Sequence, residues 1–451
     1  MPAHHTQTDP SGPVVENRIH DPAETLPREQ LRALQLRRLH EVVARVAEVP
    51  FYREAFAAAH LTPGAIRSLD DLPRLPFTTK QDLRDHYPLG FLAVPRAQVA
   101  RFHGSSGTTG KPTFVAYTAR DLCTWSDLCA RFLVAGGLRP EHTVHIAFGY
   151  GMFTGAFGLH QGVERVGAAV VPASAGGTLR QLLLIQDLRA DVLVCTPSYA
   201  CNLAEAALAQ GIDMDTFPLR YGHFGAEPWT EDMRLRIDRD LRIKAFNNYG
   251  LSEIIGPGVS GECAWRDGMH IQEDHFLVEL LDPDTLEPTP EGEAGELVLT
   301  CLTKEAMPLL RYRTRDIARL DRSPCPCGRT SVRMSRVIGR SDDMLIIRGV
   351  NVYPSQIEEA LLRVEGTAPQ YQIEVDRPGS LDEATVRVEI RPQDFSDEMR
   401  EMQRLRERID REIQSVTNIR MKIELVKPQT LERSGGKAKR VFDRRREKGL
   451  I

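Results

Sequence analysis

The sequence predicts an α/β protein with a large N-terminal domain, followed by a small mobile C-terminal α+β domain. Three observations indicate this fold class. The chain has 451 residues, enough for several domains, and 41% of them are hydrophobic. Over most of its length short apolar runs alternate with helical stretches, which favours mixed or parallel sheets covered by helices. Toward the C-terminus apolar residues instead recur with period two around two helices.

The charge balance and the cysteines exclude several classes of protein. There are 58 Lys and Arg against 62 Asp and Glu, so the chain offers no overall positive field to nucleic acid or anionic lipid. No stretch of the sequence reaches the ~18 uninterrupted apolar residues of a membrane span. Several of the eight cysteines stand alone among apolar residues. This pattern is typical of reduced thiols and predicts a cytoplasmic protein.

The first elements differ clearly in character. Residues 1–28 are polar, contain several prolines and lack a signal-peptide core, so we expect a loosely ordered tail. Over residues 29–49, apolar side chains at helical spacing alternate with Arg and Glu. This spacing predicts an amphipathic helix.

The large domain is predicted over residues 29–340. Residues 199–210 predict one of its helices. Its buried strands are predicted where short apolar runs are bounded by Gly, Pro or Asp. These runs are residues 144–148, 168–171 and 192–195.

The small domain is predicted over residues 341–451. Its first helix is expected to begin at a capping box, in which Ser355 is followed three residues later by Glu358. The second helix is predicted over residues 399–416, where one face is apolar. Strands with period-two patterns are expected at residues 371–375, 386–390 and 423–425.

Residues 104–113, with the sequence GSSGTTGKPT, are rich in glycine and hydroxyl groups. Glycines let backbone amides turn toward a ligand and hydroxyls add donors, a combination that suits a polyphosphate. The segment is not a P-loop, because five residues separate Gly104 from the Gly-Lys pair and Pro112 replaces the Mg²⁺-binding hydroxyl. A flexible Gly/Ser loop is the alternative.

Residues 248–253, with the sequence NYGLSE, place an aromatic ring four residues before a carboxylate. The ring of Tyr249 is suited to stacking on a base, and Glu253 to holding Mg²⁺. The alternative is a turn into a helix that Ser252 caps.

Residues 311–316, with the sequence RYRTRD, contain three arginines and one carboxylate. We expect the arginines to surround Asp316 and to keep it ionised and fixed in position. A surface ion-pair network is the alternative.

Two segments mark the C-terminal region. Residues 339–344, GRSDDM, lie where the apolar pattern changes and predict a linker or hinge. Residues 433–440, RSGGKAKR, place two glycines before Lys437. This pattern fits an exposed loop that brings an ammonium group to a phosphate, or a solvated basic tail.

These five segments, in this order and at these separations, resemble the adenylate-forming superfamily of acyl-CoA synthetases and adenylation domains. The resemblance extends from Phe51 to Phe442. Three stretches are similar more closely to the phenylacetate-CoA ligase family. They are residues 148–174, residues 225–229 (GAEPW) and residues 339–360.

The resemblance implies a role for each segment in binding ATP. Tyr249 would lie against the adenine, and Glu253 would bind Mg²⁺. Asp316 and Arg340 would hold the ribose hydroxyls, because a carboxylate accepts hydrogen bonds well from a diol. The residues expected to contact the β- and γ-phosphates are Ser105, Ser106, Gly107, Thr108, Thr109, Gly110 and Lys111.

The implied chemistry suits these residue types. A carboxylate would attack a phosphorus surrounded by negative oxygens, so positive charge and alignment matter more than a base. By similarity, Lys437 would bridge the acyl carboxylate and the α-phosphate. The small domain would then turn about Asp342 to admit the thiol.

The resemblance also implies an acyl pocket. Aromatic residues separated by glycines leave room for a flat ring, so we expect an aryl or arylacetic acid as substrate. Core aromatics beside helix-packing glycines are the alternative for each single residue. The expected pocket residues are Tyr150, Gly151, Phe153, Phe157, Gly225, Ala226, Glu227 and Pro228.

A further group of residues stands apart from ATP chemistry. Cys263, His270, Cys325 and Cys327 form a Cys₃His set that suits a structural tetrahedral zinc ion. The two halves are far apart in sequence, and His275 is an alternative to His270. Reduced thiols with a surface histidine are the competing interpretation.

The expected function is that of an ATP-dependent aryl-acid:CoA ligase that releases AMP and pyrophosphate. The alternative acceptor is the phosphopantetheine of a carrier protein. A binding protein without catalysis, including a nucleic-acid binder, is disfavoured by the intact Lys437 and Glu253 and by the acidic total charge. We expect no nucleic-acid or membrane partner, and a homodimer is compatible with the sequence.

Overall fold

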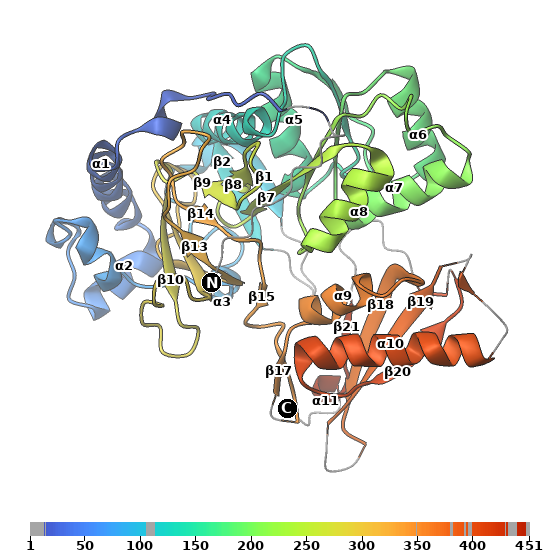
Figure 1. The fold of residues 1–451 in the computed structure, drawn as a ribbon. Coiled ribbons are helices and arrows are strands. Elements are labelled where there is room, and N and C mark those ends of the chain that lie inside the picture. The colour runs from blue at the N-terminus through green and yellow to red at the C-terminus, as the bar shows by residue number, and fades with distance from the viewer. Residues whose placement is uncertain are drawn as a thin grey trace.

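The computed structural model describes residues 13, 15–104, 113–348, 350–378, 382–391, 394–395, 399–428, 430–431 and 440–447. Two bodies are visible in Figure 1, a large domain above and a smaller C-terminal domain below it. None of the helices in this part of the chain combines the length and hydropathy needed to cross a bilayer.

The large domain is built on a mixed sheet, here called the central sheet. Strands β7, β6, β5, β3 and β4 are parallel, whereas β13, β14, β9 and β8 join them in antiparallel pairs. In spatial order its described strands are β13 (Leu320–Asp321), β14 (Arg333–Met334), β9 (Met269–Ile271), β8 (Gly256–Glu262), β7 (Lys244–Leu251), β6 (Tyr221–Phe224), β5 (Val192–Cys195), β3 (Thr143–Ile146) and β4 (Ala169–Val171).

Helices cover both faces of the central sheet, as predicted. Val192 and Val194 of β5 belong to one buried cluster, whereas Leu193 and Cys195 belong to another, because successive side chains point to opposite faces. The first face carries α4 (Ala119–Ala135) and α5 (Thr154–Val166), which pack on β8. The second face carries α6 (Thr178–Asp187), α7 (Pro197–Ala209) and α8 (Glu231–Leu241).

A second sheet and a hairpin complete the core of the large domain. The sheet is antiparallel and pairs Asp316 with Arg340 through β12 and β15. Its strands are β10 (Phe276–Leu281), β11 (Gly295–Cys301), β12 (Tyr312–Ala318) and β15 (Gly339–Arg340). The hairpin consists of β1 (Val99–Gly104) and β2 (Phe114–Thr118).

The N-terminal segment is held more firmly than the sequence suggests. From Val15 onward the tail lies against the large domain, where Arg139 donates to the carbonyl of Glu16 (2.5 Å) and Asp21 caps η1. The predicted helix over residues 29–49 corresponds to α1, which ends at Val46, and a separate helix begins at Pro50. The elements are η1 (Pro22–Thr25), α1 (Arg28–Val46), α2 (Pro50–Ala58), η2 (Pro63–Ala65), η3 (Leu69–Arg74), α3 (Lys80–Asp85) and η4 (Arg96–Gln98).

The C-terminal domain has the predicted α+β character. Period-two residues face one another across its sheet, for example Ile373 opposite Val386, and bury a separate core against α9 and α10. Its elements are β16 (Leu345–Ile347), β17 (Val350–Val352), α9 (Pro354–Leu362), β18 (Thr367–Asp376), β19 (Glu383–Ile390), α10 (Met399–Thr417), β20 (Lys422–Val426), β21 (Val441–Asp443) and α11 (Arg444–Glu447).

The start of α9 differs from the prediction. Tyr353, not Ser355, is the N-cap, and its amide donates to the side chain of Gln356 (2.9 Å). Pro354 takes the first helical position, where its missing N–H has no cost. Ser355 instead donates to the carbonyl of Ile338, which joins the small domain to the large one.

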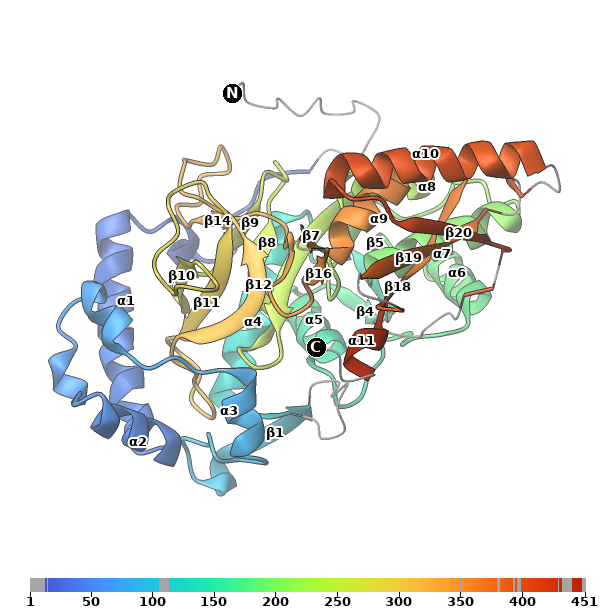
Figure 2. The same ribbon diagram turned by 90° about the horizontal axis from the view of Figure 1, so that it is seen from below.

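The two domains touch along α8 and α9. Figures 1 and 2 both show these helices side by side, and an ion pair joins Arg363 to Asp232 (3.7 Å). Leu362 at the end of α9 packs on the buried cluster beneath α7 and α8. Among the described residues, the small domain is therefore joined to the large one by both polar and apolar contacts.

Candidate active site

Several predicted site residues that the structure describes lie in loops at one edge of the central sheet. Because β3, β5, β6 and β7 are parallel, their carboxyl ends meet there, as they do at the ligand-binding edge of open α/β sheets. Side chains join the loops that follow them. Asn248 donates to the carbonyl of Phe224 (2.8 Å), the amide of Ser198 donates to Glu227 (2.7 Å), and the hydroxyls of Thr154 and Ser252 lie 2.8 Å apart.

Tyr249, Asp316 and Arg340 form a connected group. The hydroxyl of Tyr249 donates to Oδ2 of Asp316 (2.7 Å), and Arg340 donates to Oδ1 of the same carboxylate (2.8 Å). Burial, followed by the charge of Asp316, raises the pKa of Tyr249 well above its ordinary value, so the phenol stays protonated as the donor. The group therefore holds an aromatic ring and a carboxylate in fixed positions.

The three arginines near Asp316 do not surround it, which corrects the sequence-based expectation. In β12, Arg313 and Arg315 point to the face opposite Asp316, because side chains alternate along a strand, whereas Arg311 precedes the strand. Arg311 pairs with Glu279 (2.9 Å), and Arg313 pairs with Glu296 (2.7 Å). The positive partner of Asp316 is Arg340, which the pairing of β12 with β15 brings opposite it.

Glu253 has two lysine neighbours that the motifs did not reveal. The ammonium of Lys80 lies 3.2 Å from its carboxylate, and the ammonium of Lys304 donates to its backbone carbonyl (3.4 Å). Burial lowers the pKa of Lys304, whose ammonium also lies 4.6 Å from the ring centre of Tyr117. Lys80 is the first residue of α3, and Thr79 caps this helix. The capping box indicates that a helix begins here, but it does not indicate that Lys80 contacts Glu253.

The first predicted acyl segment forms an aromatic cluster beside α5. The rings of Tyr150 and Phe157 meet edge to face with their centres 5.3 Å apart, and the hydroxyl of Tyr150 lies 3.0 Å from Nδ1 of His160. Phe153 is 51% exposed. Nothing lies within 4 Å of a Cβ added at Gly151. The segment thus combines a fixed aromatic pair with an exposed ring and open space.

The second predicted acyl segment comes directly after β6 in the sequence and packs against β7. A Cβ added at Gly225 would lie 2.7 Å from the carbonyl oxygen of Asn248, so glycine is required there. Ala226 has φ 71°, a left-handed conformation that is unfavourable for alanine. Such strain tends to occur at binding sites. Pro228 follows Glu227 in the same turn.

The predicted phosphate-binding residues and the predicted catalytic lysine lie outside the described residues. This applies to Ser105–Lys111 and to Lys437. The ends of the first segment are placed, because β1 and β2 pair Gly104 with Phe114. The amide of Gly104 also donates to the carbonyl of Met152 (2.8 Å), which joins this hairpin to the acyl segment.

Asp342, the predicted hinge, binds Arg340, which also belongs to the group formed with Tyr249 and Asp316. Arg340 donates to both of its carboxylate oxygens, at 2.9 and 3.0 Å, while also binding Asp316. Burial opposes the shift, but Asp316 and Asp342 raise the pKa of Arg340, so its charge is permanent. One guanidinium therefore bridges the large domain and the first residues after it.

The small domain contains a buried cluster of Glu358, Tyr371 and Arg440. Arg440 is three residues after Lys437 in the sequence. Arg440 lies 3.5 Å from the carboxylate of Glu358 and 4.3 Å from the ring centre of Tyr371. Burial raises the pKa of Glu358 to about 7, against the charge of Arg440 and with a further contribution from Glu227. Glu227 belongs to the loop after β6, so the charges of the two domains act on each other here.

The predicted metal ligands are brought together elsewhere in the large domain. The ligand atoms of Cys263, His270, Cys325 and Cys327 all lie within 4.8 Å of one another. His275 is not part of this group. It lies beside Asp274 (3.0 Å) and Thr303 (2.7 Å).

Comparison with known proteins gives the family. The model of the AMP-binding enzyme family matches residues 70–301, and that of the AMP-binding enzyme C-terminal domain matches residues 349–445. Phenylacetate-coenzyme A ligase of Thermus thermophilus is 54% identical over 94% of this chain and 98% of its own length. That of Escherichia coli is 47% identical over 96% of this chain and 99% of its own length. The chain belongs to the phenylacetate-CoA ligase family of AMP-binding enzymes.

Two solved structures of a related enzyme match this chain with different TM-scores. A 2-hydroxyisobutyryl-CoA ligase in the postadenylation state with 2-HIB-AMP matches at TM-score 0.89, with 30% identity over 95% of this chain and 93% of that one. The same enzyme with 2-HIB-AMP and CoA in the thioesterification state matches at 0.70, with 30% identity over 95% and 94%. Identity and coverage are nearly equal in the two comparisons, so this chain as a whole superposes better on the first structure than on the second.

Proposed function

We propose that this chain activates an aryl or arylacetic acid with ATP and transfers the acyl group to CoA, with release of AMP and pyrophosphate. The observation that carries this proposal is a set of four relatives named phenylacetate-coenzyme A ligase. They are 46–54% identical over 94–96% of this chain. The substituents on the ring of the acid are not specified by the proposal.

ATP would be held at the carboxyl edge of the central sheet. The fixed ring of Tyr249 would lie against the adenine, and residues 105–111 would contact the β- and γ-phosphates. Tyr249 and Arg340 hold the carboxylate of Asp316 in position, and a carboxylate is a strong acceptor for hydroxyl groups. Asp316 would accept hydrogen bonds from the ribose hydroxyls.

Mg²⁺ would be held by Glu253, a carboxylate at the turn between β7 and β8. Carboxylate oxygen suits this ion, which usually keeps water and phosphate as its other ligands. Lys80 lies beside the same carboxylate and would face the phosphates as a second cation. The proposed cofactor set also includes Zn²⁺, for which a separate ligand group lies at the other end of β8.

The first step would join the acid to the α-phosphate. A carboxylate oxygen of the acid attacks the α-phosphorus, and pyrophosphate leaves with the electrons of the broken P–O bond. Lys437 would neutralise the charge that gathers between the two anions. Burial opposes the shift, but Tyr371, Glu358 and Glu227 raise the pKa of Arg440, so the charge of this described residue interacts with a carboxylate of the large domain.

The second step would transfer the acyl group to sulfur. The thiolate of CoA attacks the acyl carbon, the C–O bond to phosphate breaks, and AMP leaves. Lys437 would obstruct this attack, so the small domain has to turn about Asp342. The Arg340–Asp342 pair would hold the first arrangement until it is exchanged for new contacts.

A substrate panel tests the proposal. Pyrophosphate release is measured with ATP, Mg²⁺ and phenylacetate, benzoate, hydroxylated ring analogues or medium-chain fatty acids. The aromatic side chains of Tyr150, Phe153 and Phe157 predict that aromatic acids support release. Release with fatty acids and none with aromatic acids would contradict the proposed substrate class.

The acceptor is tested separately. Thioester formation is compared with free CoA and with the phosphopantetheine arm of a holo carrier protein. The proposal predicts transfer to free CoA. Transfer to the carrier protein alone would keep the adenylation and replace the acceptor.

A further inference from the structure

Four buried side chains at the edge of the central sheet have the geometry of an assembled metal site. The sulfurs of Cys263 and Cys325 are 3.7 Å apart, and the sulfur of Cys327 lies 3.3 Å from Nε2 of His270. A tetrahedral ion with Zn–S of ~2.3 Å and Zn–N of ~2.0–2.1 Å separates its ligands by about 3.8 Å for two sulfurs and about 3.6 Å for sulfur and nitrogen. The observed separations agree with these values within a few tenths of an ångström.

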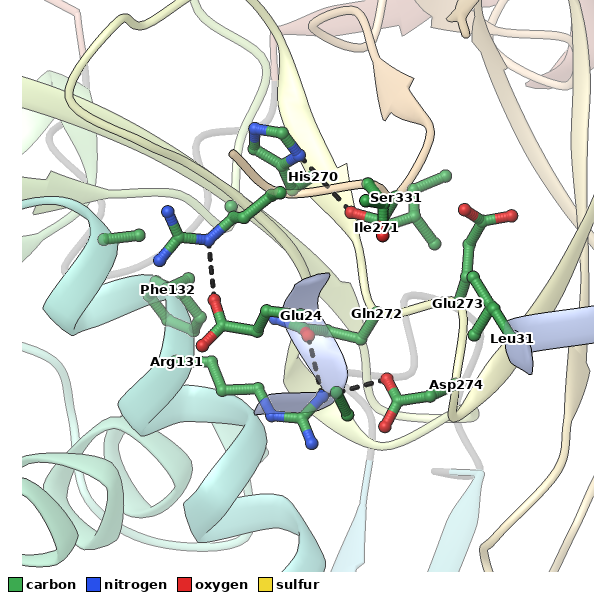
Figure 3. A pocket seen from close by; sticks show the side chains of 15 residues that line it. Glu24, Leu31, Arg131, Phe132, His270, Ile271, Gln272, Glu273, Asp274 and Ser331 are labelled. Atoms are coloured by element: carbon green, nitrogen blue, oxygen red, sulfur yellow. Dashed lines mark hydrogen bonds and ion pairs between the residues drawn. The ribbon is translucent and has the colours of Figure 1, made fainter. Parts of the chain in front are cut away.

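The surroundings orient the ligands as in known metal sites. Nδ1 of His270 lies 3.3 Å from the hydroxyl of Ser331, a contact that Figure 3 shows as a dashed line. The other ring nitrogen, Nε2, is left to face the sulfur of Cys327. The amide of Arg329 donates to the sulfur of Cys327 (3.4 Å).

The backbone of the Cys-Pro-Cys-Gly turn presents both thiols on one side. The amide of Gly328 donates to the carbonyl of Cys325 (3.1 Å), which closes the turn. Gly328 has φ +82°, a conformation that favours glycine. The turn lies in the loop between β13 and β14, whereas Cys263 follows β8 and His270 lies in β9. Four ligands thus come from three separate segments.

The loop between β13 and β14 also binds the N-terminal segment through hydrogen bonds. Asn17 donates to the carbonyl of Cys327 (2.8 Å), and Arg329 donates to the carboxylate of Glu24 (2.6 Å). Figure 3 shows Glu24 among the residues that line the pocket next to His270. The amide of Thr330 also donates to the carbonyl of Glu24 (3.1 Å).

We infer that Cys263, His270, Cys325 and Cys327 bind one structural zinc ion, which fastens the β13–β14 loop and, through it, residues 15–27 to the central sheet. All four positions of the ion are filled by protein, as in structural sites. Cys263 follows one end of β8 and Glu253 precedes the other, and a strand of seven residues is about 20 Å long. The inference is therefore independent of the ligase chemistry.

Metal analysis of the full chain tests the site directly. Elemental analysis is expected to give one zinc per chain for the wild type and for Cys123→Ser, which changes an exposed cysteine outside the group. Cys327→Ser is expected to lose the ion. A wild type that holds only traces of zinc and takes up no Co²⁺ in its place would overturn the inference, as would a Cys263–Cys325 disulfide.

A ligand exchange covers the case in which loss of zinc unfolds the protein. His270→Cys keeps four ligands and is expected to retain one metal ion. In the cobalt-substituted protein, the visible absorption of tetrahedral Co²⁺ should shift to longer wavelength as sulfur replaces nitrogen. An unchanged cobalt spectrum would show that His270 is not a ligand.

Limited proteolysis tests the fastening. Removing zinc with a chelator is expected to speed tryptic cleavage after Arg18, whose carbonyl accepts from Arg329 (2.7 Å). Cleavage at an exposed control site, Arg239, should be unchanged. Equal cleavage after Arg18 with and without zinc would overturn the role assigned to the ion even if the metal is present.

Discussion

Replacing Asp316 by Asn tests most sharply the proposal that Tyr249, Asp316 and Arg340 bind the nucleotide. The amide keeps the size of the side chain but loses the charge that faces Tyr249 and Arg340, at 2.7 and 2.8 Å. Hydrogen bonds to a charged group contribute ~1.5–3 kcal/mol, and each 1.4 kcal/mol is a factor of ten. We therefore expect the KM for ATP to rise by about 10- to 150-fold. Because binding is lost rather than transition-state contacts, kcat should fall much less.

The assay is pyrophosphate release at varied ATP and saturating acid, with thermal unfolding measured in parallel. Glu205→Gln is the matched control, since it breaks an acid–arginine pair with Arg236 (2.8 Å) on the surface of α7 and α8. That variant should keep the wild-type KM. A KM for ATP within about twofold of wild type in a folded Asp316→Asn protein would refute the proposed contact with ribose.

Three further outcomes are expected. Glu358 has a folded pKa of about 7 against 4.5 for the ordinary group, so its stabilising neutral form is fully present below pH 4.5 and lost as pH rises through 7. In the wild type, the free energy of unfolding should therefore decrease as pH rises from acidic to neutral. In Glu358→Gln, urea titrations should show a decrease smaller by up to ~3 kcal/mol, and the same pH dependence in both proteins would contradict this. Gly158→Ala places a Cβ 2.4 Å from Trp125 and should cost ~1–3 kcal/mol in urea unfolding, whereas Gly155→Ala, on the same helix with open space, should stay within ~1 kcal/mol; equal effects would refute the packing argument. Lys437→Ala should lower adenylation by roughly 100- to 1,000-fold with ATP binding retained in calorimetry, and full activity would place the charge elsewhere.

The parallel half of the central sheet was predictable because its strands are continuous apolar runs. Residues 192–195 coincide with β5, and residues 168–171 overlap β4. β8, with the sequence GPGVSGE, has no such pattern although it is buried throughout. A Cβ at Gly261 would lie 2.4 Å from Phe132, so glycine is present to admit α4. Such a requirement arises from packing between distant segments and leaves no local signal.

The candidate site was predictable where a motif is contiguous and unpredictable where contacts are long-range. Tyr249 and Glu253 lie in one short segment, and the structure keeps both at the carboxyl edge of the central sheet. The pairing of Asp316 with Arg340 depends on the register of β12 and β15. Lys80 reaches Glu253 only through the tertiary fold. Alternation along β12 also explains why neighbouring arginines do not bind Asp316.

The central claim is activation of an aromatic acid through an acyl adenylate, followed by transfer to CoA. Mass spectrometry of single-turnover mixtures with phenylacetate, ATP and Mg²⁺ tests it most directly. Without CoA, we expect phenylacetyl-AMP and pyrophosphate; after addition of CoA, phenylacetyl-CoA and AMP should replace the adenylate. Formation of ADP and phosphate, or of a thioester with no detectable adenylate, would contradict the account.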